Sequence, residues 1–233
     1  MTIGGAVVFR PEPGNARTAA LLAAAGIDVL RQPLFAVSPV AWTPPDPVSF
    51  DALLLTSANA VRHAGGGLAT LAGLPVLAVG EATAAAARAA GLTVALAGDR
   101  DARAIGDLAR REGFGRLLHL AGRDHIALPG VVPIAVYASD ALSVAPGAAQ
   151  GWAGRVALLH SARAARCFVA LIERDTAARG SIAVAALSPA VRDAAGQGWA
   201  AVALASRPTD AALVACAAAL IDPPRGDVDK RCR

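Results

Sequence analysis

Small or hydroxyl-bearing residues follow several apolar runs of the sequence and come directly before alanine-rich stretches. If the apolar runs are parallel strands and the alanine-rich stretches are helices, these residues lie at the carboxyl ends of the strands. The first N–H groups of each helix then have no partner inside the helix and can bind carboxylates or phosphates. The turns that fit this pattern are Thr56-Ser57, Gly80-Glu81-Ala82-Thr83, Ser161 and Ser188-Pro189.

Two interpretations of these turns are open. Taken singly, a serine or proline at such a place is explained as a helix cap or a first helical residue. Taken together, four similar turns favour an anion-binding site. One helix N-terminus contributes only about 0.3 to 1 kcal/mol to holding a charge, so a ligand with many anionic groups would need several turns at once.

The sequence contains one tyrosine and four histidines that could transfer protons. Tyr137 follows an apolar run, where it either packs with its hydroxyl at the surface or donates a hydrogen bond into a binding cleft; a phenol stays protonated at neutral pH. His119 and His160 are expected at strand ends, and His63 and His125 on a helix surface or a loop. A lone histidine is more often structural than catalytic, although His160 stands beside Ser161 and so points toward the expected site.

The usual cofactor and metal motifs are absent from the sequence. It has no G-x-G-x-x-G, G-x-S-x-G, C-x-x-C or H-E-x-x-H motif, and its one lysine, Lys230, cannot serve a phosphate-binding loop. The three cysteines, Cys167, Cys216 and Cys232, are too widely spaced for a disulfide framework or a metal motif. We therefore expect neither nucleotide nor redox cofactor chemistry, and a reducing, cytoplasmic location.

Composition narrows the class of partner. The 233 residues are 55% hydrophobic and 4% aromatic, with a net charge of +4 carried almost wholly by dispersed arginines. Few aromatic side chains and no basic stripe argue against nucleic-acid binding. The N-terminus does not resemble a signal peptide, and the longest charge-free stretch, residues 64–80, is broken by glycines and a proline, so we expect no membrane span.

The alternation of short apolar runs with helical stretches predicts an α/β protein with parallel sheets. Gly26 and Gly91 are expected to end the helices that precede them. The strands are expected at residues 7–9, 27–30, 52–55, 76–79, 92–95, 117–120, 134–137, 156–159, 182–187 and 201–204. The helices are expected at residues 15–25, 81–90, 101–111 and 209–221, and from residues 57, 161 and 189 onward.

A weak internal repeat indicates two similar lobes. Residues 53–60 (LLLTSANA) resemble residues 157–164 (ALLHSARA), and 95–97 resemble 203–205 at nearly the same offset. Proline-rich and glycine-rich passages near residues 39–47 and 130–147 mark two crossings between lobes. We therefore expect a discontinuous lobe (1–36 plus 140–233), an inserted lobe (40–134) and linkers at about 35–46 and 131–140, with a ligand cleft between the lobes.

Six short motifs, in order along nearly the whole chain, resemble the bacterial uroporphyrinogen-III synthase family. They are Phe9-Arg10-Pro11, residues 55–61 (LTSANAV), residues 79–84 (VGEATA), residues 136–139 (VYAS), Leu159-His160-Ser161 and residues 205–210 (ASRPTD). The resemblance implies two flavodoxin-like α/β lobes, one of them discontinuous, joined by a two-stranded linker. It also implies a cofactor-free and metal-free enzyme that closes hydroxymethylbilane, a linear tetrapyrrole, into uroporphyrinogen III with inversion of the last pyrrole ring.

The same resemblance assigns residues to the reaction. Tyr137 matches the tyrosine that the family is thought to use to protonate the leaving hydroxyl, and backbone N–H groups would hold the acetate and propionate groups. We further expect a monomer that makes transient contact with hydroxymethylbilane synthase. The expected substrate-binding residues are Arg10, Thr56, Ser57, Ala58, Asn59, Gly80, Thr83, His160, Ser161, Ala162 and Ser188.

Two departures from the family pattern and two rival functions stand beside this interpretation. Val191 stands where the second lobe would repeat the hydroxyl of Thr83, and His160 replaces a more usual threonine. One rival is a non-enzymatic two-lobed protein that binds or senses a small anion, although such proteins normally carry a signal peptide or a DNA-binding segment. The other rival is a different cofactor-free lyase or isomerase that uses the same cleft.

Overall fold

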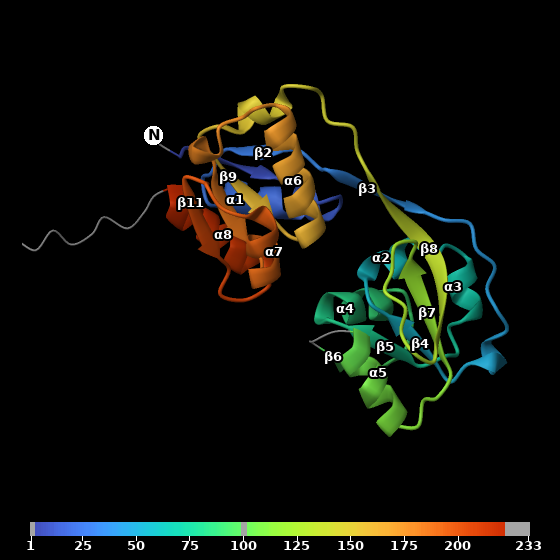
Figure 1. Cartoon of the computed structure of the whole chain (residues 1–233). Helices are drawn as coiled ribbons and strands as arrows, with labels where there is room; N and C mark the ends of the chain where they lie inside the picture. Colours follow the sequence, from blue (N-terminus) through green and yellow to red (C-terminus); the bar gives the residue numbers. More distant parts are fainter. Residues whose placement is uncertain (1–2, 99–101, 222–233) are drawn as a thin grey trace, which may run out of the picture. The chain divides into compact units, whose positions relative to one another are not determined.

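The structure is a computed structural model that describes residues 3–98 and 102–221. Its contacts divide the chain into two units (Figure 1). The split unit consists of Met1–Ala36 and Ala141–Arg233, and the inserted unit is Val37–Asp140. Each unit is built around its own sheet, so the two are described separately.

The sheet of the split unit has five strands, all parallel, in the order β11-β10-β9-β1-β2. Its strands are β1 (Gly5–Val8), β2 (Val29–Arg31), β9 (Arg155–Leu159), β10 (Ala183–Ala186) and β11 (Ala201–Leu204). Its helices are α1 (Gly14–Ala24), α6 (Ala162–Arg174), α7 (Pro189–Ala195) and α8 (Asp210–Ile221). Short 3-10 helices lie at Ala148–Trp152 and Arg179–Ser181.

Successive residues of β1 enter different cores, as the alternation of side chains along a strand requires. Val7 belongs to the core that contains Phe168 of α6 and Val191 of α7. Ala6 and Val8 instead pack with side chains of α1 and α8. The sheet is therefore covered by helices on both faces, which explains why its central strands are apolar apart from Arg155 at the start of β9.

The sheet of the inserted unit has the order β3-β8-β7-β4-β5-β6. Its strands are β3 (Phe35–Pro39), β4 (Ala52–Leu55), β5 (Val76–Val79), β6 (Val94–Gly98), β7 (Leu117–Gly122) and β8 (Val131–Ala141). Its helices are α2 (Ala58–His63), α3 (Gly67–Thr70), α4 (Glu81–Ala89) and α5 (Ala102–Arg111), with a 3-10 helix at Pro47–Ser49. Leu53 and Leu55 face the core beneath α2, α3 and α4, whereas Leu54 faces the core beneath α5.

Strands β3 and β8 carry the chain from one unit to the other and back. They run antiparallel: the Leu142 N–H donates to the Leu34 carbonyl at 2.9 Å, and the Val40 N–H donates to the Val136 carbonyl at 3.0 Å. β3 is an edge strand, which is where a proline such as Pro39 is tolerated.

The two sheets share one spatial arrangement but are threaded differently. The outward series β9-β10-β11 of the split unit corresponds to β4-β5-β6 of the inserted unit, and the neighbours β1-β2 correspond to β7-β8. β1 and β2 come first in their unit, whereas β7 and β8 come last in theirs. With the parallel strands of each sheet numbered in chain order, the spatial order is therefore 2-1-3-4-5 in the split unit and 3-2-1-4-5 in the inserted unit. The prediction of parallel α/β sheets is confirmed, and the two threadings are a finding of the structure.

Candidate functional site

In each unit the chain adds strands toward one edge of the sheet and then, in a second series, toward the other edge, so that the two series begin on neighbouring strands. This switch point lies between β1 and β9 in the split unit and between β4 and β7 in the inserted unit. In open α/β sheets ligands bind beyond the carboxyl ends of the strands at such a point. Arg10 and His160 follow β1 and β9, and Thr56 follows β4, so several predicted residues lie at the two switch points.

The split-unit switch point holds a charged cluster. The Arg10 guanidinium forms an ion pair with Asp210, the first residue of α8, and lies 3.4 Å from the Thr18 hydroxyl. His160 Nε2 is 3.1 Å from the same Asp210 carboxylate. A side chain on Gly14 would collide with the guanidinium, with 2.4 Å between its Cβ and Arg10 Nε, so the start of α1 is shaped to receive Arg10.

At neutral pH this cluster carries one positive charge, on Arg10, and one negative charge, on Asp210. Burial lowers the pKa of His160, and the hydrogen bond with Asp210 offsets this only in part. For Asp210 burial acts to raise the pKa, but the His160 hydrogen bond and the Arg10 charge outweigh it and hold the pKa below its ordinary value. At neutral pH His160 is therefore neutral, and Arg10 is held by a carboxylate of its own unit.

Two of the predicted serines cap helices with their side chains. The Ser161 hydroxyl accepts from the Ala164 N–H at 3.1 Å at the start of α6. The Ser57 hydroxyl accepts from the Asn59 N–H at 3.2 Å at the start of α2. These hydroxyls satisfy their own helices, so the groups of these turns that face outward along the helix axis are backbone N–H groups.

The third serine turn differs. Ser188 precedes α7 in an extended conformation (φ −152°, ψ 165°) but its side chain makes no capping hydrogen bond, and Pro189 is the first helical residue. Proline has no N–H, so this helix start offers one donor fewer than the starts of α2 and α6, whose first residues are Ala58 and Ala162.

The inserted-unit switch point is neutral. Thr56 Oγ1 lies 3.0 Å from Nε2 of His119, which comes from β7 and is 4% exposed. Burial, with a smaller contribution from the charge of His125, lowers the pKa of His119 to about 4. His119 therefore presents Thr56 with a neutral ring at physiological pH, and it lies within β7 rather than at its end.

The remaining predicted residues of the inserted unit lie around α2 and α4. Gly80 precedes α4 with φ +80°, a left-handed conformation that favours glycine, and its N–H donates to the Gly98 carbonyl at 2.6 Å. Thr83, in the first turn of α4, is only 5% exposed. The Asn59 side-chain oxygen accepts from Arg62 at 3.0 Å on the surface of α2.

Tyr137 lies on β8, next to the carboxyl end of β7. It is partly buried, pairs with Gly122 across the two strands, and packs its ring 6.4 Å from the His63 ring of α2. The sequence motifs had not indicated Asp210, His119 or Gly122 as parts of these clusters. Two of the three carry a signal in the sequence: Asp210 ends the motif at residues 205–210, and His119 is one of the four histidines that could transfer protons.

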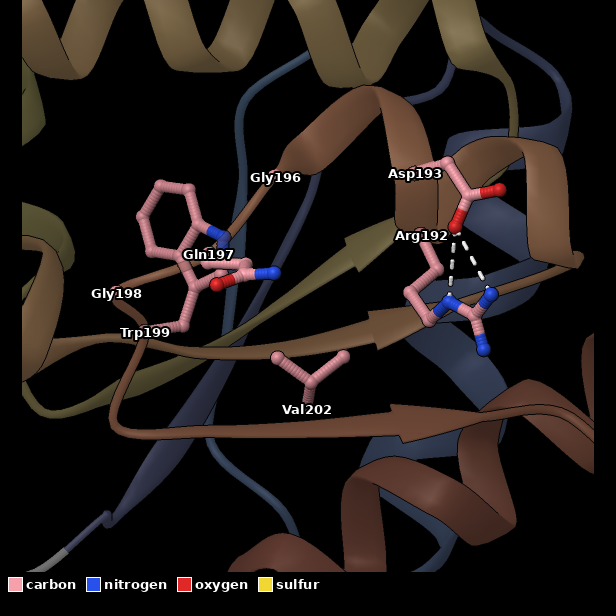
Figure 2. Close-up of a pocket in the computed structure, with 7 residues that line it drawn as sticks. All are labelled: Arg192, Asp193, Gly196, Gln197, Gly198, Trp199 and Val202. Carbon is pink, nitrogen blue, oxygen red and sulfur yellow. Dashed lines mark hydrogen bonds and ion pairs between the residues drawn. The ribbon is translucent and has the colours of Figure 1, made fainter.

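The structure also contains a hollow of about 590 Å³ in the split unit. It is lined by α7 and by the loop that enters β11, including Arg192, Asp193 and Trp199 (Figure 2). This loop joins the amino end of β11, the opposite end of the strands from Arg10, His160 and Ser161. The hollow holds none of the predicted site residues.

The side chains described here form no group of three or more histidine, cysteine, aspartate or glutamate residues that could hold a metal ion. Cys167 and Cys216 are free thiols. No helix within residues 3–98 and 102–221 is long and apolar enough to cross a membrane. Cys232 and residues 99–101 lie outside the described residues.

Comparison with known proteins gives a family and a fold. The family profile described as "Uroporphyrinogen-III synthase HemD" matches residues 16–215, most of the chain. The structure is similar to the uroporphyrinogen-III synthetase of Helicobacter pylori 26695 (TM-score 0.63, 15% identity), over 93% of this chain and 99% of that one. It is also similar to a mutant uroporphyrinogen III synthase of the extremely thermophilic bacterium Thermus thermophilus (TM-score 0.51, 19% identity), over 91% and 95%. No curated protein matches the sequence.

Proposed function

The chain belongs to the uroporphyrinogen-III synthase family, and from this premise we propose how its own residues act in the closure of hydroxymethylbilane to uroporphyrinogen III. The match of the family profile to residues 16–215 carries the assignment. The family makes the protein an enzyme of tetrapyrrole biosynthesis. It therefore argues against the two rival functions, a non-enzymatic protein that binds or senses an anion and a different cofactor-free lyase or isomerase.

We propose that the carboxyl edges of both sheets bind the substrate's acetate and propionate groups. The first-turn N–H groups at Ala58 and Ala162 are the donors best placed for this, because the serine hydroxyls beside them cap their own helices. Arg10 supplies a charged contact. Its pairing with Asp210 fixes the direction of the guanidinium and leaves its side chain 24% exposed. Thr56, Asn59, Gly80, Thr83, His160 and Ser188 complete the proposed set.

The chemistry proposed for this site is mostly positioning. Protonation of the terminal hydroxyl lets it leave as water, while the pyrrole nitrogen supplies electrons and gives up its proton, so that an azafulvene forms. Attack by the substituted carbon of the last ring gives a spiro intermediate, which fragments and closes again with that ring inverted. A site that holds the carboxylates fixed favours this path over direct closure, and its dipoles stabilise the cationic species on the way.

Product analysis tests the activity. Purified protein incubated with freshly prepared hydroxymethylbilane, without added metal or nucleotide, is expected to give predominantly the type III isomer, separated from type I by chromatography. A reaction without protein measures the spontaneous closure. Formation of type I alone, at the rate of that control, would contradict the assignment.

We propose Tyr137 as the proton donor to the leaving hydroxyl, because its phenol lies at the carboxyl end of β7 beside the inserted-unit switch point. The variant Tyr137→Phe keeps the ring and deletes the hydroxyl. Turnover is expected to fall about a hundredfold, the lower end of general acid catalysis. Stability is expected to change by no more than about 1 kcal/mol, one hydrogen bond's worth. Turnover within about threefold of the wild type, after correction for spontaneous closure, would show that Tyr137 is not the proton donor.

A further inference from the structure

We propose that Gly122 is a positioning residue for Tyr137: the missing side chain at Gly122 leaves the space in which the phenol lies, and any larger residue would move the hydroxyl. This inference rests on the proposed role of Tyr137. Gly122 itself touches no reacting atom in the proposal and acts only through the tyrosine.

The pairing of β7 with β8 brings the two residues together. From Leu117 to Ala121 the strands pair in step, ending with Ala121 opposite Ala135. The register then shifts by one, and Gly122 stands opposite Tyr137. Val136 is the extra residue of this irregularity, and it is fully buried in the core. Such a shift changes the direction of the following side chain, and these irregularities are frequent beside active sites.

The contact is at the reactive end of the ring. A Cβ placed on Gly122 would lie 2.9 Å from Tyr137 Cζ, 3.0 Å from Cε2 and 3.1 Å from the hydroxyl oxygen. Distances this short are too close for two unbonded carbon atoms, so one group must move. A methyl group at this position therefore displaces the hydroxyl end of the phenol.

Hydrogen bonds hold the backbone at Gly122 and at Tyr137, so the tyrosine ring is the group that would move to relieve the contact. The Arg123 N–H donates to the Tyr137 carbonyl at 2.8 Å, which ties the two strands together beside the contact. The Gly122 carbonyl is engaged by His125 Nδ1 at 2.9 Å. Gly122 is not among the residues with a positive φ, so alanine meets no backbone strain there. An effect of Gly122→Ala therefore reports the contact with Tyr137.

The test compares Gly122→Ala with Gly73→Ala, a control in the same unit where an added Cβ meets no atom within 4 Å and φ is not positive. Gly122→Ala is expected to lower kcat by about tenfold to a hundredfold, the cost of misplacing a reacting group, with KM within about twofold. Gly73→Ala is expected to keep the wild-type kcat. In the Tyr137→Phe background Gly122→Ala is expected to cost less than about twofold, because the hydroxyl it would misplace is gone.

A second readout does not depend on activity. Tyr137 is the only tyrosine of the sequence, so protein labelled with 3-fluorotyrosine gives one fluorine resonance. Gly122→Ala is expected to shift this resonance, and Gly73→Ala is expected to leave it in place. An unchanged resonance in Gly122→Ala would overturn the contact.

The outcomes separate this inference from the function on which it rests. Equal losses of kcat in the wild-type and Tyr137→Phe backgrounds would overturn positioning, because Gly122 would then act independently of the hydroxyl. Full activity of Tyr137→Phe would overturn the role of Tyr137, and that of Gly122 with it, whatever the resonance does. Failure of the wild type to form the type III isomer would contradict the function itself, while the resonance would still report the contact.

Discussion

The buried His119 and the partly buried His160 stand at the two switch points, and loss of solvent lowers the pKa of both. His160 contacts Asp210 in the split unit, and His119 contacts Thr56 in the inserted unit. Neither ring adds a positive charge at neutral pH. The cation at the split-unit switch point is therefore Arg10, a group whose charge does not vary over the physiological pH range.

The low pKa of His119 makes the stability of the inserted unit depend on pH. Between pH 6.5 and about 4 an unfolded histidine binds a proton that folded His119 does not, so stability is full above pH 6.5 and falls as the pH drops through this window. The loss is expected to reach up to about 3 kcal/mol near pH 4. Urea unfolding at several pH values measures it, with His119→Gln as the comparison.

In His119→Gln the loss of stability caused by protonation of this histidine in the unfolded state disappears. The free energy of unfolding therefore varies less with pH than in the wild type. Overall stability also falls, because an amide replaces a ring fitted to its site, so the slope against pH and not the absolute value is the readout. Identical slopes in the two proteins would show that His119 is protonated in the folded state as readily as in the unfolded one.

Residue types alone could indicate Tyr137 and the serine turns, because each follows a recognisable apolar run. They could not indicate that Gly122 faces Tyr137 or that Asp210 binds Arg10. The first contact depends on a register shift between β7 and β8, and the second joins residues 200 positions apart in the sequence. Contacts of this kind are set by tertiary pairing and leave no local pattern.

At the scale of elements, α6 and α7 both begin after an extended serine, but only Ser161 caps its helix with its side chain, and only α7 has a proline as its first residue. Ser161 and Ser188 have nearly the same extended conformation, with φ −152° and ψ 153° or 165°. After Ser188 the chain places a proline, and an extended conformation is what the residue before a proline requires. The turn before α6 could therefore accept a proline at Ala162 without strain.

The variant Ala162→Pro removes one N–H that the helix does not use and tests whether the substrate does. KM is expected to rise about tenfold, the value of one hydrogen bond to a carboxylate, while the melting temperature stays within about 2 °C. Ser161→Ala is the matched comparison: it keeps the N–H, loses the cap, and is expected to lower stability by about 1 kcal/mol. An unchanged KM in Ala162→Pro would argue against this N–H as a substrate donor.

Most elements could be located from the sequence because they are apolar and regular. The strands predicted at 52–55, 76–79 and 201–204 have those bounds in the structure. The strand pattern alone predicts no strand at β3, because its proline-ended and mostly exposed sequence resembles a linker, and β8 extends beyond the predicted 134–137. The two-stranded linker that the family resemblance implies does cover both strands. Both differences fall on the antiparallel pair, in which exposed and buried residues are interspersed, so that no continuous apolar run marks the full length of either strand.

At the scale of the whole molecule, the two units differ in how their cores are assembled. Both cores of the inserted unit draw only on residues between Val37 and Asp140. Both cores of the split unit need residues from its two separate segments, such as Val7 with Phe168 and Leu22 with Leu213. The inserted unit is thus complete in one stretch of chain.

We therefore expect a fragment of residues 37–140 to unfold cooperatively in urea, followed by circular dichroism. A fragment of residues 141–233 is expected to show no cooperative transition, because β9 lacks its central neighbour β1. Adding a peptide of residues 1–36 is expected to restore part of the transition. Cooperative unfolding of the second fragment alone would mean that β1 and β2 contribute little to the split unit.

The position of β1 between β2 and β9 also sets an order of events during protein synthesis. β1 leaves the ribosome before the inserted unit, and β9 is not made until the whole inserted unit has been translated. At ordinary rates of translation this interval is on the order of ten seconds, long enough for the inserted unit to fold. Throughout it the apolar residues 5–9 lack the strand that pairs with one of their edges in the finished sheet, and an unpaired edge of this kind can pair with a strand of another chain.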